Sequence, residues 1–307
     1  MNLAIIGATG LVGEVIIKVL QERDIYIKNI FFAASSKSVN KSLEFKGQKI
    51  KIISIEKVLE QKLDAAIFSA GKEVSNLWAP KFSAKGVTVI DNSSAWRMDK
   101  SKKLIIPEIN GRELNQNDKI IANPNCSTIQ MLMTLSPIHK KYCITRVIVS
   151  TYQSITGTGR TAINQLNNEY KKISGEKAYK YQIHQNVIPQ CDDFIENGYT
   201  KEEMKLVNET HKILDKNISI SATAVRVPVI GGHCESINLT LENPFELNEI
   251  KNLLSNSKGL VVEDDPGNLI YPMPLNSIDK DEVFVGRIRR DYSCENSLNL
   301  WVVADNL

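Results

Sequence analysis

Short apolar segments recur along the first part of the chain and predict the strands of a sheet that is covered on both faces. Residues 3–6, 30–34, 65–68 and 87–90 each form a mainly apolar run. Such runs are typical of parallel strands buried on both sides. After the first run, the apolar positions recur with helical spacing. They predict an amphipathic helix whose apolar face holds Val12, Val15, Ile16, Val19 and Leu20.

The second half of the chain is richer in strands. Strand patterns occupy residues 146–152, 218–227, 237–241, 282–289 and 298–303, and helical patterns occupy 161–172, the segment after Thr200, and 247–254. Thr200 and Glu203 match a capping box, so Glu203 is interpreted as structural. The predicted fold class is α/β, with an N-terminal Rossmann-type dinucleotide-binding domain at 1–125 and an α+β domain with a mixed sheet at 126–303.

A glycine-rich turn joins the first strand to the first helix. Strand, glycine turn and helix in this order match a dinucleotide fingerprint, because glycines let a pyrophosphate approach the backbone at a helix N-terminus. A turn of this kind can also have a purely local cause. Its position directly after an apolar strand favours a cofactor site formed by Gly7, Thr9, Gly10, Leu11, Val12 and Gly13.

The residues after the second strand indicate which dinucleotide binds. An NAD site usually has Asp or Glu there, for the ribose 2′-hydroxyl. This chain has Ser35, Ser36 and Lys37, which suit a 2′-phosphate, so we predict NADP; an ordinary polar turn is the alternative. Ligands of open α/β sheets bind at the carboxyl ends of strands. The turns after the next two strands therefore add the candidate contacts Ser69, Ala70, Gly71, Asn92 and Ser93.

Cys126 is the candidate nucleophile. It follows Asn125, a good N-cap, and precedes a helical pattern at 129–135. The free N–H groups and partial positive charge of a helix N-terminus favour the reactive thiolate. For an isolated cysteine, a small buried residue at a turn is the commoner situation. The presence of other candidate catalytic residues in the chain favours the interpretation of Cys126 as the nucleophile.

Several polar residues could work with that cysteine. Gln153 ends a predicted strand beside a glycine-bearing loop; the alternative is a polar residue that only fixes its own loop. His233 follows two glycines, which predicts a loop position and favours an acid/base role. Arg97 is a candidate anion binder or an ordinary surface arginine. Glu202 and Lys205 share one helix face, either as ligand contacts or as a solvated ion pair.

Composition excludes several classes of protein. The 307 residues carry a net charge of +3 with no basic block, which argues against nucleic acid as a partner. No apolar run is long enough for a membrane span, and the chain begins with a strand pattern rather than a signal peptide. Five scattered cysteines match neither a disulfide framework nor a metal site. We expect a cytoplasmic protein without a metal ion.

The motifs together resemble the aspartate-β-semialdehyde dehydrogenases over nearly the whole chain. The resemblance is carried by the segments 7–13, 91–97 and 123–128, by the Gln153 loop, and by 226–229 with Gly232 and His233. It implies reversible NADP-dependent conversion of L-aspartyl-4-phosphate to L-aspartate-4-semialdehyde and inorganic phosphate, in lysine, threonine and methionine biosynthesis, which includes diaminopimelate. It also implies a homodimer or homotetramer with the second domain at the dimer interface.

The resemblance further implies a role for each site residue. Cys126 would carry a thioester, His233 would exchange protons, Gln153 would orient the substrate, and Asn125 would support the oxyanion. Arg226 would bind the substrate carboxylate and Glu202 its ammonium group. Lys205 and Arg97 would hold phosphate. The implied additional cofactor contacts are Thr156, Gly157 and Asn306.

The end of the chain departs from the family pattern. In this family, residues like those at 301–307 lead into a closing helix that packs on the cofactor domain, and here that helix is absent. We expect the segment near 304–307 to return to the first domain. Two alternative functions remain open: an N-acetyl-γ-glutamyl-phosphate reductase with the same chemistry, and a catalytically silent NADP-binding relative. Retention of Cys126, Gln153, Arg226 and His233 argues against the silent relative.

Overall fold

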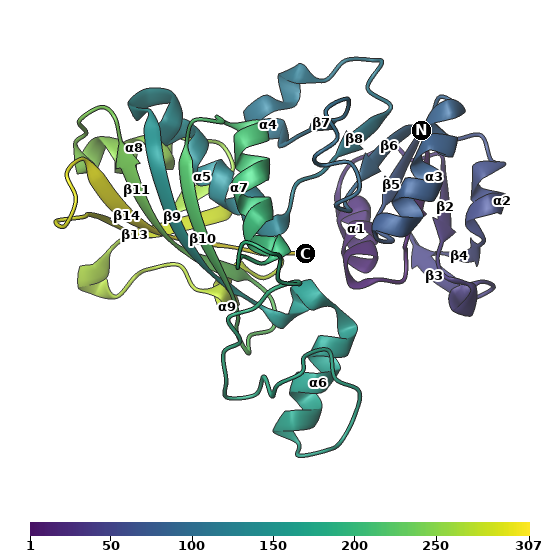
Figure 1. The fold of residues 1–307 in the computed structure, drawn as a ribbon. Coiled ribbons are helices and arrows are strands. Elements are labelled where there is room, and N and C mark those ends of the chain that lie inside the picture. Colours follow the sequence, from purple (N-terminus) through teal and green to yellow (C-terminus); the bar gives the residue numbers. More distant parts are fainter. The chain divides into compact units, whose positions relative to one another are not determined.

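The computed structural model describes residues 1–307 and divides them into two compact units, Met1–Pro124 and Asn125–Leu307. Each unit is built on its own sheet, as the labels of Figure 1 show. No helix of the chain combines the length and the apolarity that crossing a bilayer requires.

The sheet of the first unit has eight strands in the order β3-β4-β2-β1-β5-β6-β8-β7. All of its pairs are parallel except β3 with β4. The strands are β1 (Asn2–Ile6), β2 (Asn29–Ala33), β3 (Ser42–Phe45), β4 (Gln48–Ile53), β5 (Ala65–Phe68), β6 (Thr88–Asp91), β7 (Lys103–Leu104) and β8 (Ile120–Ala122). The helices are α1 (Leu11–Glu22), α2 (Ile55–Leu59), α3 (Lys72–Ala84) and α4 (Pro107–Asn110).

Two apolar cores cover the two faces of this sheet. Leu3 and Ile5 of β1 lie in one core with Ile17 of α1, whereas Ala4 and Ile6 lie in the other with Phe82 of α3. Alternate residues of one strand therefore face different cores, which explains the unbroken apolar run. The predicted Rossmann-like unit is confirmed.

The buried face of α1 differs from the predicted one. Gly13, Ile17 and Leu20 are its buried positions, whereas the predicted Val12, Val15, Ile16 and Val19 are only half-buried. A Cβ on Gly13 would stand 2.3 Å from the carbonyl oxygen of Gly7. The helix therefore packs through this glycine, and the buried stripe is rotated from the one that the largest side chains suggested.

The sheet of the second unit has six strands in the order β10-β9-β11-β14-β13-β12. β9 pairs with β10, and β12 with β13, in parallel, and the other pairs are antiparallel, so the predicted mixed sheet is confirmed. The strands are β9 (Ile144–Gln153), β10 (Ser219–Arg226), β11 (His233–Leu241), β12 (Leu260–Val262), β13 (Val283–Arg290) and β14 (Ser297–Ala304).

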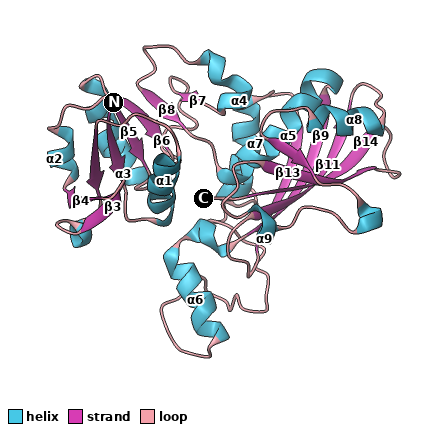
Figure 2. Cartoon of the chain, turned by 180° about the vertical axis from the view of Figure 1, so that it is seen from behind, coloured by secondary structure: helices cyan, strands magenta, loops and turns pink.

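Helices cover this second sheet. α5 (Cys126–Tyr142) packs on β9, β11, β13 and β14 and lies between α7 (Lys201–Ile213) and α8 (Leu247–Ser255). The short helix α9 (Pro274–Ser277) contacts β14. In Figures 1 and 2, α6 (Arg160–Tyr170) and its flanking loops extend away from the sheet. The start of α5 and the ends of β9 and β10 are the parts of this unit that position the candidate site.

Candidate active site

Cys126 is the first residue of α5, as the N-cap pattern predicts. The Asn125 side-chain oxygen accepts hydrogen bonds from the backbone N–H groups of Ser127, at 3.0 Å, and Thr128, at 3.3 Å. The backbone N–H of Asn125 donates in turn to Glu209 of α7, at 2.7 Å. The cap is thus fixed from both sides, and the half-buried Cys126 side chain starts from a defined backbone position.

Three candidate residues form a row at the ends of adjacent strands. Gln153 ends β9, Arg226 ends β10 and His233 begins β11. Gln153 is the register partner of both Arg226 and His233, so the three lie side by side across the sheet. All three side chains are buried. The Gln153 amide also donates to the Ser127 hydroxyl, at 3.0 Å, which links this row to the first turn of α5.

His233 does not lie on a loop, contrary to the prediction. It is fully buried and begins β11, because its backbone pairs with Gln153 on one side and Ala304 on the other. The two preceding glycines, both with positive φ, form the turn that enters the strand. The glycine turn was therefore recognised, but His233 was wrongly placed on the loop and not in the strand.

The surroundings of His233 fix its protonation. Burial, together with the positive charge of Arg226, lowers the pKa of the imidazole to about 3, so the ring is neutral near pH 7. The backbone N–H of Ser154 donates to Nδ1 at 3.1 Å, so the ring hydrogen belongs on Nε2. Nε2 has no partner. A Cβ on Gly157 would lie 3.3 Å from Nε2 and 3.2 Å from Nη1 of Arg226, so both atoms lie under Gly157.

Arg226 keeps a buried donor without a partner. Its Nη1 donates to the carbonyl oxygen of Ser154 at 2.6 Å, whereas its Nε is buried and makes no hydrogen bond. A buried guanidinium with an unused N–H is a candidate anion site, because an unpaired buried donor is costly and a carboxylate accepts from two guanidinium nitrogens at once. The geometry is compatible with a substrate carboxylate.

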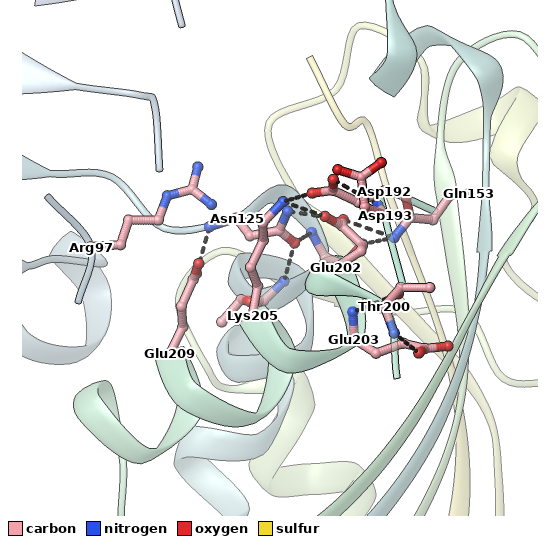
Figure 3. Close-up of polar contacts among 12 residues, drawn as sticks. Arg97, Asn125, Gln153, Asp192, Asp193, Thr200, Glu202, Glu203, Lys205 and Glu209 are labelled. Carbon is pink, nitrogen blue, oxygen red and sulfur yellow. Dashed lines mark hydrogen bonds and ion pairs between the residues drawn. The ribbon is translucent and has the colours of Figure 1, made fainter. Parts of the chain in front are cut away.

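Glu202 is the centre of a buried polar cluster (Figure 3). Its Oε1 accepts from the amides of Asn125, at 3.0 Å, and Gln153, at 3.1 Å, and its Oε2 accepts from Lys205 at 2.9 Å. Burial opposes ionisation, but the Lys205 charge and the three hydrogen bonds outweigh it and hold the pKa of Glu202 below its ordinary value. The interpretation of Glu202 and Lys205 as a merely solvated pair is therefore wrong.

Glu203 has the structural role that the capping box predicts. Its carboxylate accepts from the backbone N–H of Thr200 at 2.6 Å, and the Thr200 hydroxyl accepts from the N–H of Glu203 at 3.2 Å. Its second oxygen accepts from the N–H of Ala224 on β10, at 2.9 Å. Glu203 thereby anchors the start of α7 to the strand that carries Arg226.

Three residues of this site were not selected from the sequence. Ser154 holds His233 and Arg226 through its backbone, Asp192 pairs with Lys205 at 2.8 Å, and Glu209 accepts from Asn125. Glu209 was recognisable, since it lies two helical turns after Glu202 and on the same face. Asp192 comes from an irregular loop, and its approach to Lys205 follows no sequence period.

The first unit contains a cavity of about 480 Å³ at the expected dinucleotide turn. Strand order reverses at β1, where such cavities form in doubly wound sheets. Gly7 has φ +92°, and a Cβ there would stand 2.3 Å from the Ser69 carbonyl oxygen, so only glycine fits. The predicted residues lining the cavity are Gly7, Thr9, Gly10, Ser35, Ser69 and Ala70. Apolar residues complete it and were missed: Ile6, Ala33, Ala34, Ile55, Val74 and Trp78.

The other predicted cofactor residues of the first unit do not line this cavity. They are Leu11, Val12, Gly13, Ser36, Lys37, Gly71, Asn92 and Ser93. Asn92 belongs instead to a network with Arg97, whose Nε and Nη2 donate to the carbonyl oxygens of Asn123, at 2.9 Å, and Asn92, at 3.0 Å. Arg97, which was predicted to bind phosphate, is therefore buried, and two backbone carbonyl groups orient its guanidinium.

Thr156, Gly157 and Asn306 lie in the second unit. The hydroxyls of Ser154 and Thr156 donate to the Asn306 side-chain oxygen at 2.8 and 2.9 Å, and Asn306 Nδ2 is buried without a partner. Residues 304–307, expected to return to the first domain, belong to the second unit, where Ala304 pairs with His233 and Asn306 makes these bonds. Because its Nδ2 donor is unused, Asn306 is a candidate for contact with a ligand. It lies next to Ser154, the residue that donates to His233.

Family models match both units. The model described as "Semialdehyde dehydrogenase, NAD binding domain" matches residues 2–117, and "Semialdehyde dehydrogenase, dimerisation domain" matches residues 135–307. The aspartate-semialdehyde dehydrogenase of Aquifex aeolicus (strain VF5) is 47% identical over 316 residues, which cover 100% of this chain and 93% of that protein. The chain belongs to the aspartate-semialdehyde dehydrogenase family.

Further relatives agree with this membership. The aspartate-semialdehyde dehydrogenase of Bacillus subtilis (strain 168) is 41% identical, over 100% of this chain and 93% of that protein. The crystal structure of aspartate semialdehyde dehydrogenase II from Vibrio cholerae matches with a TM-score of 0.93 at 41% identity, over 99% of this chain and 93% of that one. The resemblance stated from the motifs is confirmed.

Proposed function

We propose that the chain is an aspartate-semialdehyde dehydrogenase that reversibly converts L-aspartyl-4-phosphate to L-aspartate-4-semialdehyde with NADP as cofactor. The observation that carries the proposal is the row of Gln153, Arg226 and His233, hydrogen-bonded through Gln153 to the first turn of the helix that Cys126 opens. The names of the relatives support it, as does a Vibrio cholerae enzyme structure described as complexed with ASA.

Cys126 is proposed as the nucleophile. In the biosynthetic direction its thiolate attacks the acyl carbon of aspartyl phosphate, the carbon–oxygen bond to phosphate breaks, and a thioester remains. When bound, NADPH supplies a hydride to that carbon. The resulting oxyanion collapses to the aldehyde, the carbon–sulfur bond breaks, and the Cys126 thiolate is released. A sulfur nucleophile suits this sequence because a thioester retains enough energy for reversal by phosphate.

His233 is proposed to act on the oxygen of the thioester through Nε2. With Nδ1 accepting from Ser154, Nε2–H is a donor aimed at the space under Gly157, and it can stabilise the oxyanion. In the oxidative direction, Nε2 accepts a proton only in the tautomer with hydrogen on Nδ1. In that tautomer Nδ1 gives up the hydrogen bond from the Ser154 backbone N–H and donates to the Ser154 hydroxyl oxygen, which lies 3.2 Å away. Ser154 therefore supports the His233 ring in both directions of the proposed reaction.

The charged residues are proposed to hold the two anionic ligands and the ammonium group. Arg226, with its unused Nε, binds the α-carboxylate of the substrate. Glu202 meets the substrate ammonium, since it is the buried, ionised carboxylate of the site. Lys205 and Arg97 bind phosphate, Asn125 supports the oxyanion, and Gln153 orients the substrate.

The cavity of the first unit is proposed as the NADP site. Gly7 lets a pyrophosphate approach the start of α1, and the apolar lining suits an adenine ring. Ser35 lines the cavity and, with Ser36 and Lys37, offers donors and positive charge but no carboxylate to repel a 2′-phosphate. We expect kcat/KM to be higher with NADP than with NAD. Equal values for the two cofactors would contradict this assignment.

The test of the function is a spectrophotometric assay of NADPH formation from L-aspartate-4-semialdehyde, with and without inorganic phosphate. Phosphate-dependent NADPH formation is expected. Turnover only with N-acetylglutamate semialdehyde would favour the N-acetyl-γ-glutamyl-phosphate reductase alternative. No turnover with either aldehyde, in a protein that still binds NADP, would favour a silent relative.

Assembly and location complete the proposal. We propose a homodimer or homotetramer that forms through the second unit, which the dimerisation-domain family model matches. We also propose that the protein acts in the cytoplasm, in the biosynthesis of lysine, threonine and methionine. Light scattering during size exclusion tests the assembly, and a single-chain mass at all concentrations would contradict it.

A further inference from the structure

The Lys205 ammonium group lies between two carboxylates. Its Nζ donates to Glu202 Oε2 at 2.9 Å and to Asp192 Oδ2 at 2.8 Å (Figure 3). Burial alone would lower the pKa of Lys205, but the negative charges of Glu202 and Asp192 raise it above its ordinary value. The Lys205 ammonium group is therefore a cation. Together with the carboxylates of Glu202 and Asp192, it forms a cluster with one positive and two negative formal charges.

The two carboxylates are held very differently. Glu202 is buried and accepts hydrogen bonds from the amides of Asn125 and Gln153, so its removal would take an acceptor from the Asn125 amide and leave Gln153 only its bond to Ser127. Asp192 has a side chain that is 34% exposed and lies in a loop. Its backbone φ is +68°, a left-handed conformation that non-glycine residues seldom adopt. Asp192 is therefore the partner of Lys205 that is easier to displace.

We propose that Asp192 positions Lys205 and competes with phosphate for it, so that Asp192 sets the phosphate concentration at which the site fills. This inference rests on the proposed role of Lys205 in binding phosphate. Without phosphate, the carboxylate keeps the flexible lysine side chain in place. When phosphate binds, its oxygens replace Asp192 Oδ2 at Nζ, and Asp192 turns toward solvent while Glu202 keeps its hydrogen bond.

The decisive variant is Asp192→Asn. Asparagine tolerates a positive φ, and its oxygen can still accept the hydrogen bond that the backbone N–H of Asp193 donates to Asp192 Oδ1 at 2.9 Å. It removes the charge that repels phosphate and pairs with Lys205. We expect the phosphate KM of the oxidative reaction to fall about fivefold, which corresponds to about 1 kcal/mol for a partly exposed ion pair. The change in KM should exceed any change in kcat.

The neighbouring residue supplies a matched control. The carboxylate of Asp193 forms an ion pair with Lys201 at 2.7 Å, whereas that of Asp192 pairs with Lys205. Asp193→Asn therefore removes one negative charge at the next position of the same loop and should leave the phosphate KM unchanged. Asp192→Gly, which accepts the positive φ without strain, is the second variant if asparagine impairs folding, and it should lower the phosphate KM in the same way.

Lys205→Met separates this inference from the proposed function. If it raises the phosphate KM while Asp192→Asn leaves that KM unchanged or higher, the competition is wrong and the function stands. A rise in semialdehyde KM without a lower phosphate KM in Asp192→Asn would make Asp192 a substrate ligand and also overturn the inference. If the wild-type protein shows no phosphate-dependent turnover, the proposed function fails, and this inference fails with it.

Discussion

Glu235 offers a quantitative test of the structure close to the site, through the variant Glu235→Gln. It lies on β11 two residues after His233, is fully buried, and neither carboxyl oxygen has a hydrogen-bond partner. Its register partners are Thr151 and Val302, so no charge faces it across the sheet. Burial raises the pKa of Glu235 well above its ordinary value, against a weaker opposing contribution from Gln130. The carboxyl group of Glu235 therefore stays protonated to a higher pH in the folded protein than in the unfolded chain.

The magnitude follows from proton linkage. Between the ordinary carboxyl pKa and the raised one, the folded state binds one more proton than the unfolded state at this position. Its contribution to the free energy of unfolding is complete at low pH and falls by about 1.4 kcal/mol per pH unit as the pH rises. Glutamine has the same shape and no proton to lose. The stability of Glu235→Gln relative to wild type should thus increase by about 1.4 kcal/mol for each pH unit in that window.

The assay is urea unfolding of wild type and variant in identical buffers at pH 5.5, 6.5 and 7.5. We expect the difference in unfolding free energy to grow with pH, and the melting temperatures to diverge in the same direction. Glu246→Gln is the control for the loss of a carboxylate at the surface, because its side chain is 79% exposed. A constant difference for Glu235→Gln would refute the buried neutral acid.

Two further predictions concern Arg226 and the neighbouring Gly157. Arg226→Lys should raise the semialdehyde KM about tenfold or more with a smaller effect on kcat, since a point charge replaces the guanidinium fork; an unchanged KM in steady-state assays would exclude the carboxylate role. Gly157→Ala should lower kcat/KM about tenfold or more, because its Cβ would lie 3.3 Å from Nε2 of His233 and occupy the space of the reacting oxygen. Unaltered kinetics would show that substrate approaches His233 from elsewhere.

Local signals in the sequence predicted several elements correctly. Asn125 caps α5 as its position indicates, and the capping box of Thr200 and Glu203 is present. The glycine turn after β1 fits because Gly7 needs a positive φ and leaves no room for a side chain. The two caps depend on residues within one turn of the chain and can be read without knowledge of the fold, whereas the carbonyl oxygen that excludes a side chain at Gly7 belongs to the distant Ser69.

The hairpin of β3 and β4 was missed for a local reason. In its strands polar residues alternate with apolar ones, which is a strand signal, but both runs are short and most of the polar residues are charged. The turn itself was recognisable, since Lys46 and Gly47 both adopt positive φ, as a two-residue hairpin turn requires. A lysine before the glycine is an uncommon choice there, so the pattern did not stand out.

The row at the strand ends could not be derived from sequence spacing. Gln153, Arg226 and His233 meet because β9 pairs with β10 in parallel and with β11 antiparallel, in one particular register. A register between distant segments depends on the packing of the whole sheet. Family resemblance identified these residues, but only the structure explains why they lie together and why Ser154 supports two of them.

The central claim is that Cys126 carries the acyl group, and intact-protein mass spectrometry tests it directly. The protein is mixed with semialdehyde and NADP in phosphate-free buffer, so that the reaction stops at the thioester. We predict one aspartyl adduct per chain, located on Cys126 by peptide mapping and lost on adding phosphate. The adduct should be absent in Cys126→Ala and kept in Cys294→Ala, which removes an exposed cysteine. An adduct on another residue, or turnover retained by Cys126→Ala, would contradict the account.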